Sequence, residues 1–440
     1  MKIRGIINRK TYKHPINICN LGEGWSTNTI NTVIFRHHGI VTRGIFQFCA
    51  YYDPNGNVIV CKRNLKDNTL ESYNIESNAN TYDAHNSISI GIDSKDYIHI
   101  SYDHHSSKLK YKRSLEPLNI NKWTDNLKMT EENEGRVTYP SFLMLANSKD
   151  DTESKGELLF LYRDGNSGCG DAFLNKYEID TNIWVKQCKC LLNGSESRPW
   201  TSNAYWNHPS SDGERLFLSY VWRVRNGGPN EYVNNCNIGF ACSKDLGKSW
   251  STSKEKEIKL PITQVNYEVI KGIPLADNLI NQTSQALDSR GNLHIVYYSN
   301  DNNGIPQYQH LWFDGVEWKN KVISNRKNNF NLMGAGALKL PISRPEIVID
   351  KKDNVYVIFR ADFTEDKMSV IKIRPPYNRN SKIKILWNEN LCNSEPVIDR
   401  IRWKRDGILS MLIQKNYQPD HDLIDDIRKP EPCYIVDWKL

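Results

Sequence analysis

A short unit recurs along the chain, and it constrains the fold more than any other feature of the sequence. Each copy is a polar turn that contains Asp with Gly or Asn, followed by a strand in which apolar residues alternate. The seven copies begin at Asp53, Asp93, Ser154, Ser210, Asp288, Asp350 and Arg405. A spacing of roughly 40 to 80 residues is typical of propeller blades with loops of different lengths. The repeats therefore predict an all-β fold, a seven-bladed β-propeller.

One stretch fits a known turn pattern of propeller blades. Residues 243–250 read SKDLGKSW, which matches the Asp-box S-x-D-x-G-x-x-W. In such a turn the Ser and Asp side chains bind the backbone of the hairpin, the Gly takes a positive φ and the Trp packs beneath. We interpret these residues as structural, because the motif by itself says nothing about activity.

The two ends of the chain are predicted to close the ring. The last segment, EPCYIVDWKL, has the alternation of a strand. We expect it to pair with strands near Trp25–Phe35, because such pairing removes exposed sheet edges. No linker interrupts the chain, so we expect a single propeller domain over residues 1–440.

Composition and charge narrow the class of partner. The 440 residues carry a net charge of +7, with 39% hydrophobic and 25% charged residues, which is ordinary for a globular chain. The basic residues are scattered, so we expect no nucleic-acid partner. The sequence has no apolar run of 18 residues and no signal-peptide core, so we expect no membrane partner. We expect a monomer, and both a secreted or periplasmic and a cytoplasmic location stay open.

Histidines stand out in one copy of the repeat. His85 precedes a strand, and His104 and His105 follow the next strand. Antiparallel neighbours would bring His85 and one of these two to the same rim, where two imidazoles can act as base and electrophile near neutral pH. The alternative for each is a hydrogen-bonded structural role, which we favour for the mid-strand residues His99 and His294.

A tyrosine and an arginine stand out in the adjacent copy. Tyr139 precedes a proline at a strand start, and Arg163 ends the next strand of the same hairpin. This pair suits an acidic sugar, because Arg binds a carboxylate with two hydrogen bonds and its charge can lower the pKa of the Tyr. The alternative is that Arg163 pairs with Asp164 or Asp171 to brace the loop. Arg223, at another strand end, would bind substrate or be solvated.

Together these segments resemble the BNR-repeat (neuraminidase-repeat-like) family that contains the ulvan lyases, which are seven-bladed propeller polysaccharide lyases. The resemblance spans residues 80–360 and rests on the sequences HN at 85–86, SYDHH, TYP, YRDGNSG, NQTSQA and SRPEIVID. It implies four catalytic residues, His85, His105, Tyr139 and Arg163, with His105 preferred to His104. We further expect four substrate-binding residues, namely His104, Asn86, Arg223 and Tyr205.

The chemistry implied by the resemblance is β-elimination at a uronic acid of an ulvan-like polysaccharide with rhamnose–uronate linkages. Arg163 would neutralise the carboxylate and stabilise the enolate. His85 or Tyr139 would remove the C5 proton, and Tyr139 would protonate the departing O4; the sequence leaves open which of the two is the base. The resemblance implies no cofactor for catalysis and is compatible with a structural divalent metal, zinc or calcium, for which the sequence assigns no ligands.

Three other functions fit parts of the sequence. A related enzyme would cleave a rhamnose–glucuronate bond of plant gum or arabinogalactan as an exo-lyase or a glycoside hydrolase. A sialidase would need three arginines on one carboxylate, for which Arg163, Arg223, Arg344 and Arg360 are the candidates, but the histidines would then be unexplained. A non-catalytic glycan-binding propeller would need no such cluster, so it would follow if His85, Tyr139 and Arg163 lay on different faces of the ring.

Overall fold

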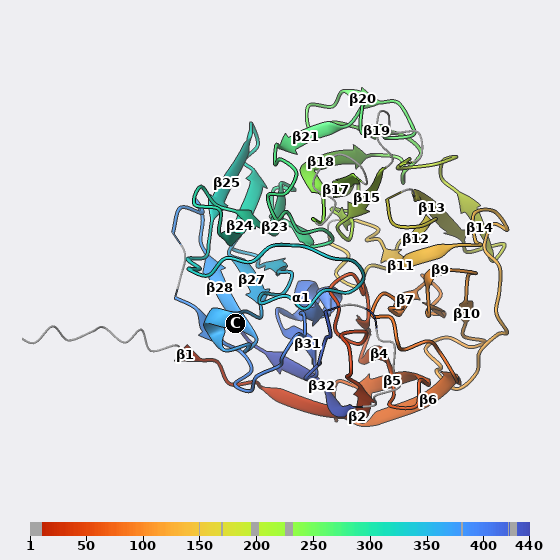
Figure 1. Ribbon diagram of the computed structural model, residues 1–440. Helices are drawn as coiled ribbons and strands as arrows, with labels where there is room; N and C mark the ends of the chain where they lie inside the picture. Colours follow the sequence, from red (N-terminus) through yellow and green to blue (C-terminus); the bar gives the residue numbers. More distant parts are fainter. Residues whose placement is uncertain are drawn as a thin grey trace, which may run out of the picture.

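The fold is a ring of β-sheets. The computed structural model describes residues 11–148, 150–168, 170–194, 202–224, 232–379, 382–420, 422 and 429–440. Strands within these ranges form seven sheets, which stand side by side around a centre (Figure 1). The sheets follow one another along the chain, and the first strands of several neighbouring sheets contact each other. The predicted all-β propeller is thus confirmed, and the seven sheets equal in number the seven repeats of the sequence.

The strands of the first three sheets, grouped by sheet, are β3 (Ile40–Arg43), β4 (Phe46–Tyr52), β5 (Val58–Asn64) and β6 (Leu70–Glu76); β7 (Ser89–Ile92), β8 (Ile98–Ser101) and β10 (Tyr111–Arg113); and β9 (His105–Ser107), β11 (Val137–Met144), β12 (Leu158–Asp164), β13 (Asp171–Glu178) and β14 (Ile183–Lys186). Those of the fourth sheet are β15 (Ser202–Trp206), β16 (Ser210–Ser211), β17 (Leu216–Val224), β18 (Asn235–Ser243), β19 (Trp250–Ser251), β20 (Glu257–Ile258) and β21 (Glu268–Lys271).

The strands of the last three sheets are β22 (Ser284–Leu287), β23 (Leu293–Asn300), β24 (Pro306–Phe313) and β25 (Trp318–Val322); β26 (Glu346–Ile349), β27 (Val355–Phe359), β28 (Ser369–Ile373), β29 (Lys384–Ile385) and β1 (Thr11–Tyr12); and β30 (Val397–Ile398), β31 (Leu409–Ile413), β32 (Pro430–Trp438) and β2 (Asn17–Trp25). Helical structure in the described residues is confined to the 3-10 turn η1 (Asp362–Thr364) and the helix α1 (Arg400–Asp406). No described helix has the length and apolar character needed to cross a membrane.

One sheet contains strands from both ends of the chain. Strand β2 pairs antiparallel with β32, from Asn17 opposite Asp437 to Trp25 opposite Pro430. The C-terminal segment is therefore a strand, as predicted, but the prediction that its partner lies near Trp25–Phe35 is wrong by about one strand length. The chain leaves the sheet after Trp25 because polar side chains there bind backbone groups: the Asn31 amide donates to the carbonyl oxygens of Trp25 (3.1 Å) and Tyr52 (2.9 Å).

The aspartates of the repeats build turns. Asp53, Asp93, Asp288 and Asp350 each accept hydrogen bonds through Oδ1 from the backbone N–H groups two and four residues further on, at 2.8–2.9 Å. A side chain that takes the place of backbone acceptors in this way fixes a tight turn between two strands. These carboxylates are therefore part of the scaffold.

The Asp-box segment makes the contacts expected from its pattern. Ser243 Oγ accepts the N–H of Gly247 (2.8 Å), and Asp245 Oδ1 accepts the N–H of Ser249 (2.9 Å). The Trp250 indole is 2% exposed and donates to the Gly247 carbonyl oxygen (3.0 Å). All of these side chains are occupied within the turn, in agreement with a structural role.

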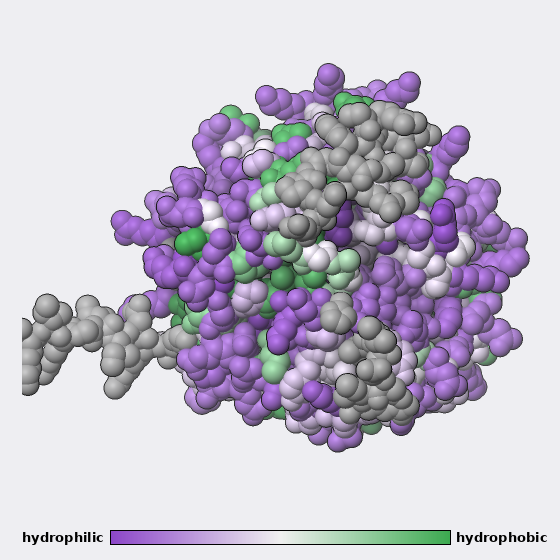
Figure 2. All heavy atoms as spheres, viewed as in Figure 1, coloured by the Kyte–Doolittle hydropathy of each residue, from purple (hydrophilic) through white to green (hydrophobic). Residues whose placement is uncertain are grey.

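The core lies between the faces of neighbouring sheets. Ile98 and Ile100 of β8 and Leu293 and Ile295 of β23 are all buried, as are the His99 and His294 side chains on the opposite faces of these strands. His99 is held by Tyr111 and Asp93, which agrees with the structural role expected for it. The outer rim is mostly hydrophilic, whereas apolar residues gather toward the middle of the face shown in Figure 2.

Candidate active site

A cavity of about 360 Å³ opens at the centre of the ring. Its lining comes from segments that flank strands of all seven sheets, so it lies where the blades converge. One side is polar and includes His85, Tyr139 and Arg223, whereas residues 334–338, which read GAGAL, supply a largely apolar wall. Propellers bring loops of successive blades together at the mouth of the central channel, and this is the geometry seen here.

The structure brings His85 and His105 together. His85 lies in the loop between β6 and β7, and His105 begins β9, which belongs to the next sheet. The two rings stack with their centroids 4.3 Å apart. The prediction that His105, rather than His104, approaches His85 therefore agrees with the geometry.

A carboxylate joins the two histidines. Asp83 Oδ1 lies 2.5 Å from Nδ1 of His85, and Asp83 Oδ2 contacts Nδ1 of His105. Burial alone would raise the pKa of Asp83, but the hydrogen bonds from His105 and His85 hold it below its usual range. An ionised carboxylate only accepts hydrogen bonds, so Nδ1 of each ring carries a proton that it donates to Asp83. Burial lowers the pKa of His85, which is therefore neutral at pH 7.

In the described part of the chain, one group of three side chains is close enough together to hold a metal ion. It consists of Asp83, His85 and His105. Ligands of a tetrahedral zinc ion at about 2.0–2.1 Å are necessarily more than 3 Å from one another. The Asp83–His85 contact of 2.5 Å is shorter than this and is a direct hydrogen bond. The cluster as arranged shares protons and does not fit a metal ion, so the structural metal stays a prediction without ligands.

Tyr139 is placed by an irregularity in β11. Its φ is +56°, and the pairing of β11 with β12 shifts register between Thr138 and Ser141. A bulky residue rarely adopts this conformation, which costs about 1–3 kcal/mol and so needs support from the surrounding structure. The shift turns the Tyr139 ring into the cavity, where it lies 6.2 Å from the His85 ring and 5.1 Å from that of Phe35.

Arg163 lies behind the tyrosine rather than at the cavity surface. It is 1% exposed, and its guanidinium carbon is 4.9 Å from the Tyr139 ring centroid. Neither Nη atom bonds to another described residue, while Nε donates to the Gly165 carbonyl oxygen (3.2 Å). The alternative pairing with Asp164 or Asp171 is not observed among the described residues: Asp164 binds Arg136, and Asp171 accepts the Gly194 N–H (2.8 Å).

The sequence predicts that Arg163 lowers the pKa of Tyr139, but the effect of burial on this pKa is larger. Burial of the phenol raises the pKa of Tyr139 well above its usual value, and the neighbouring arginines offset only part of this effect. Tyr205 behaves in the opposite way. Burial would raise its pKa too, but Arg223 and then Arg163 lower it to about 8. Arg223 donates to the Tyr205 hydroxyl at 3.1 Å and lies 4.4 Å from its ring centroid.

Three arginines line the cavity, and they differ in their partners. Arg344 pairs with Glu395 (2.9 Å), and Arg360 pairs with Asp366 (3.2 Å). Arg223 binds only neutral groups among the described residues, namely Tyr205, Asn235 and Asn281. Arg223 is therefore the cavity-lining arginine whose charge stays available for an anionic ligand.

Three of the four predicted substrate-binding residues, namely His104, Asn86 and Tyr205, do not line the cavity. His104 is fully buried, accepts the Lys110 N–H through Nε2 (2.9 Å) and contacts Ser107. Asn86 is 2% exposed and donates to the Asn80 carbonyl oxygen (2.8 Å), which holds the loop that carries His85. The predicted contacts of His104 and Asn86 with substrate do not fit this arrangement, because neighbouring backbone groups engage both side chains inside the fold. Tyr205 is 2% exposed, and its hydroxyl accepts a hydrogen bond from Arg223.

Sequence reasoning missed Asp83 and underestimated Arg344. Asp83 stands two residues before His85, and the short segment YDAH offered a signal, since an Asp at that spacing can bind the N–H of the His. That bond is present at 2.9 Å. The sequence suggests Arg344 only as a candidate sialidase residue, yet it lines the cavity with its guanidinium carbon 4.9 Å from the Phe35 ring centroid. No local pattern predicts this contact, because Arg344 lies just before β26 whereas Phe35 lies in the loop between β2 and β3, far away in the sequence.

Comparison with known proteins identifies the family. The family model described as "BNR repeat-containing family member" matches residues 46–326, which is more than half of the chain. The chain belongs to this BNR-repeat family. Within the curated proteins, the BNR-repeat chain is similar to "Ulvan lyase, long isoform" of Glaciecola sp. (strain KUL10), with 25% identity over 160 residues. That match covers 36% of this chain and only 15% of the relative's length.

Solved structures share the fold of this BNR-repeat protein. One, titled as a new family of polysaccharide lyase, PL25 ulvan lyase, aligns with a TM-score of 0.70 and 14% identity over 95% of this chain and 94% of the other. A second, titled as the same lyase bound to -[GlcA(1-4)Rha3S]-, aligns with a TM-score of 0.69 and 14% identity over 96% of each chain. At this identity the similarity shows a common propeller.

Proposed function

We propose that this BNR-repeat protein is a polysaccharide lyase that cleaves a uronic-acid-containing anionic polysaccharide by β-elimination. The observation that carries the proposal is the convergence of His85, Tyr139 and Arg223 on one central cavity, with Arg163 directly behind. Elimination next to a uronate needs a cation for the carboxylate, a base for the C5 proton and an acid for the departing O4. The cavity holds a candidate for each.

The directions of the pKa shifts of His85 and Tyr139 suggest which of them is the base and which is the acid. His85 is neutral at pH 7, and its Nδ1 proton is held by Asp83, so Nε2 has a lone pair for the C5 proton. Tyr139 has a raised pKa and keeps its proton, so it is suited to protonate O4. Proton transfer by a positioned group contributes about 10²–10⁴-fold in rate.

The substrate carboxylate is best met by Arg223. Among the described residues it has no carboxylate partner, whereas Arg344 and Arg360 each have one. A cation fixed at this point stabilises the negative charge that develops on the carboxylate as the C5 proton leaves. Arg163, which the sequence suggested for this role, would act from behind Tyr139 and Tyr205 through its charge.

Rhamnose–uronate linkages of the ulvan type are the substrate we propose first. The shared propeller with a lyase solved in complex with -[GlcA(1-4)Rha3S]- supports this choice. The apolar wall at residues 334–338 adds to it, because a deoxy sugar presents a methyl group where other sugars present a hydroxyl. An exo-acting enzyme that cleaves rhamnose–glucuronate side chains would need the same cation, base and acid. Both kinds of substrate are therefore included in one screen.

A screen of uronate polysaccharides tests the activity. We expect ulvan or a related polymer to yield an unsaturated uronate, detected by its ultraviolet absorbance, with Tyr139→Phe and His85→Ala as inactive controls. New reducing ends without absorbance would instead indicate a hydrolase. A sialidase is disfavoured because neither Tyr139 nor Tyr205 contacts a carboxylate in the described part of the chain. No product from any uronate polymer would contradict the lyase proposal.

A further inference from the structure

A second hollow lies beside the central cavity. Its volume is about 790 Å³, and it is open to solvent along the loops that follow β27, precede β30 and follow β31. It shares four lining residues with the cavity, namely Leu340, Arg360, Asn393 and Gln418. The two spaces therefore adjoin at these four residues, and a chain molecule bound in both would pass over them.

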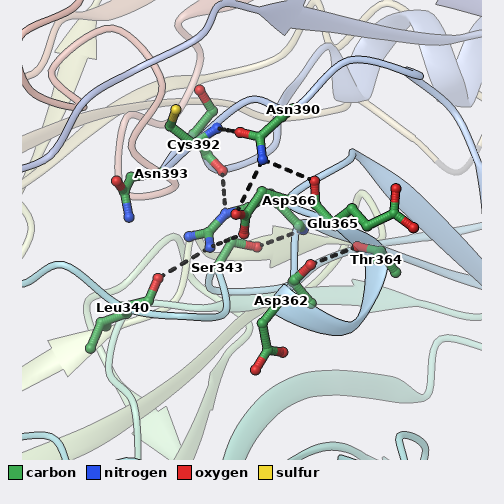
Figure 3. Close-up of polar contacts among 12 residues, drawn as sticks. Leu340, Ser343, Asp362, Thr364, Glu365, Asp366, Asn390, Cys392 and Asn393 are labelled. Carbon is green, nitrogen blue, oxygen red and sulfur yellow. Dashed lines mark hydrogen bonds and ion pairs between the residues drawn. The ribbon is translucent and has the colours of Figure 1, made fainter.

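The wall of the hollow is fixed by internal contacts. Arg360 is 2% exposed and donates to the Leu340 carbonyl oxygen (3.1 Å) while pairing with Asp366 (3.2 Å). The Asn390 amide donates to Asp366 (3.4 Å) and to the Glu365 carbonyl oxygen (3.1 Å), as Figure 3 shows. Polar groups held in this way before a ligand arrives lose little freedom on binding, which favours affinity.

The charges of the hollow leave two lysines available. Its two carboxylates are neutralised, Asp362 by Arg326 (2.8 Å) and Asp366 by Arg360. Lys339 and Lys429 are exposed and make no ion pair with another described residue.

The surroundings of these lysines also suit a sugar. The nearby Asp420 carboxylate accepts the backbone N–H of Lys339 (3.0 Å), so it is already engaged. The Lys429 ammonium lies 4.8 Å from the ring centroid of Tyr417, a partly exposed tyrosine in the lining. An aromatic ring, amides and two cations are a combination that recognises the ring face, hydroxyls and acid group of a sugar acid.

We propose that this hollow binds a further acidic sugar unit of the same polysaccharide chain whose uronate occupies the central cavity. Lys339 and Lys429 meet its acidic group, and the Asn393 amide meets its hydroxyls. The identity of the polymer rests on the proposed function. A chain held in both places extends past the bond that is cleaved, so the protein is expected to act on long chains better than on the shortest cleavable oligosaccharide.

Cys392 offers a direct probe of occupancy, because it lines the hollow and is partly exposed. The rate of its alkylation by N-ethylmaleimide is measured by peptide mass spectrometry in the Tyr139→Phe variant, with uronate oligosaccharides of increasing length. We expect long oligosaccharides to protect Cys392 and the shortest to leave it reactive. Cys188 and Cys190, which are partly exposed and line neither space, should react at an unchanged rate and provide the internal control. Equal reactivity of Cys392 at every length would overturn the proposal.

Kinetics give a second measurement. For the double variant Lys339→Ala/Lys429→Ala we expect the KM for polymer to rise about tenfold, while kcat and the KM for the shortest substrate stay unchanged. The matched control is Lys248→Ala/Lys254→Ala, which removes two exposed lysines from another blade. An unchanged KM for polymer would count against the second site.

The two proposals fail in different ways. Cleavage of a polymer without protection of Cys392 would leave the lyase activity standing and reject the second hollow. Protection of Cys392 by a polymer that is not cleaved would support the hollow as a glycan site and reject the lyase activity.

Discussion

The guanidinium carbon of Arg163 lies 4.9 Å from the ring centroid of Tyr139, yet the pKa of Tyr139 is raised. Two opposing effects meet at this phenol. A neighbouring cation favours the phenolate, whereas burial disfavours any charged form, and here burial is the larger effect. Tyr139 thus carries its proton across the neutral pH range, which the general-acid role proposed for it requires.

The first prediction concerns the Tyr139 hydroxyl. We expect Tyr139→Phe to lower kcat by about 10²–10⁴-fold, because the departing oxygen would lose its proton donor. Stability should change little, since no hydrogen bond joins this hydroxyl to another described residue and the ring stays packed against Phe35. The rate of unsaturated product and the thermal unfolding curve check both parts. Tyr73→Phe, on an exposed tyrosine of β6, is the control, and wild-type kcat in Tyr139→Phe would contradict the assigned role.

The second prediction concerns Tyr205, whose pKa is lowered from 10.0 to about 8. A spectrophotometric titration should show one phenol that ionises near pH 8. In Arg223→Gln this step should move to higher pH, because the variant loses the charge that stabilises the phenolate. If the wild-type protein has no phenol that ionises near pH 8, the environment assigned to Tyr205 is wrong.

The same shift has a consequence for stability. A group with a lower pKa in the folded than in the unfolded state adds stability above its unfolded pKa, and that stability is lost as pH falls through the folded value. The wild type should therefore gain unfolding free energy over Arg223→Gln as pH rises above about 8. Denaturant unfolding at several pH values measures the difference.

The third prediction concerns Asp83. Asp83→Asn should lower kcat by about 10–100-fold, the usual cost of removing a group that orients a reacting side chain. An amide can donate as well as accept, so it no longer fixes Nδ1–H on both His85 and His105. Nitrogen-15 NMR of the histidine rings should report a changed tautomer at one of them. Unaltered ring signals would reject the orienting role.

The pH profile adds a further check on Asp83. Its carboxylate raises the pKa of His85, so its loss should move the acid limb of kcat/KM to lower pH. Asp93→Asn is the matched control, because Asp93 contacts the buried His99 away from the cavity. A shift of the acid limb in both variants would indicate a general effect on stability.

The fold could be predicted because its signal is local and repeated. Each copy of the unit places an Asp where it accepts backbone N–H groups, as at Asp93 and Asp288, and an alternating strand follows. The partner of the last strand was harder to predict. The pairing of β32 depends on where β2 ends. Strand β2 ends where the Asn31 side chain binds backbone groups, and one of these, the Tyr52 carbonyl oxygen, is far away in the sequence.

The site could be predicted in part. His85, His105 and Tyr139 were found because they break the repeat, and they do meet. The sequence does not show which residues are buried. Of the two adjacent histidines in SYDHH, His104 is fully buried, whereas His105 is partly exposed. Burial is also the main cause of the raised pKa of Tyr139, so the sequence alone could not predict the direction of this shift.

The final prediction is that a substitution at Gly247 affects the stability of the protein and leaves its activity unchanged. This residue has a φ of +94°, and an added Cβ would lie 2.4 Å from Leu174 Cδ2. We expect Gly247→Ala to lower the unfolding free energy by about 1–2 kcal/mol through strain in the left-handed region, with kcat per folded molecule unchanged. Gly272→Ala is the control, because an added Cβ there meets no atom within 4 Å. Loss of kcat in a fully folded Gly247→Ala variant would show that the turn contributes to activity after all.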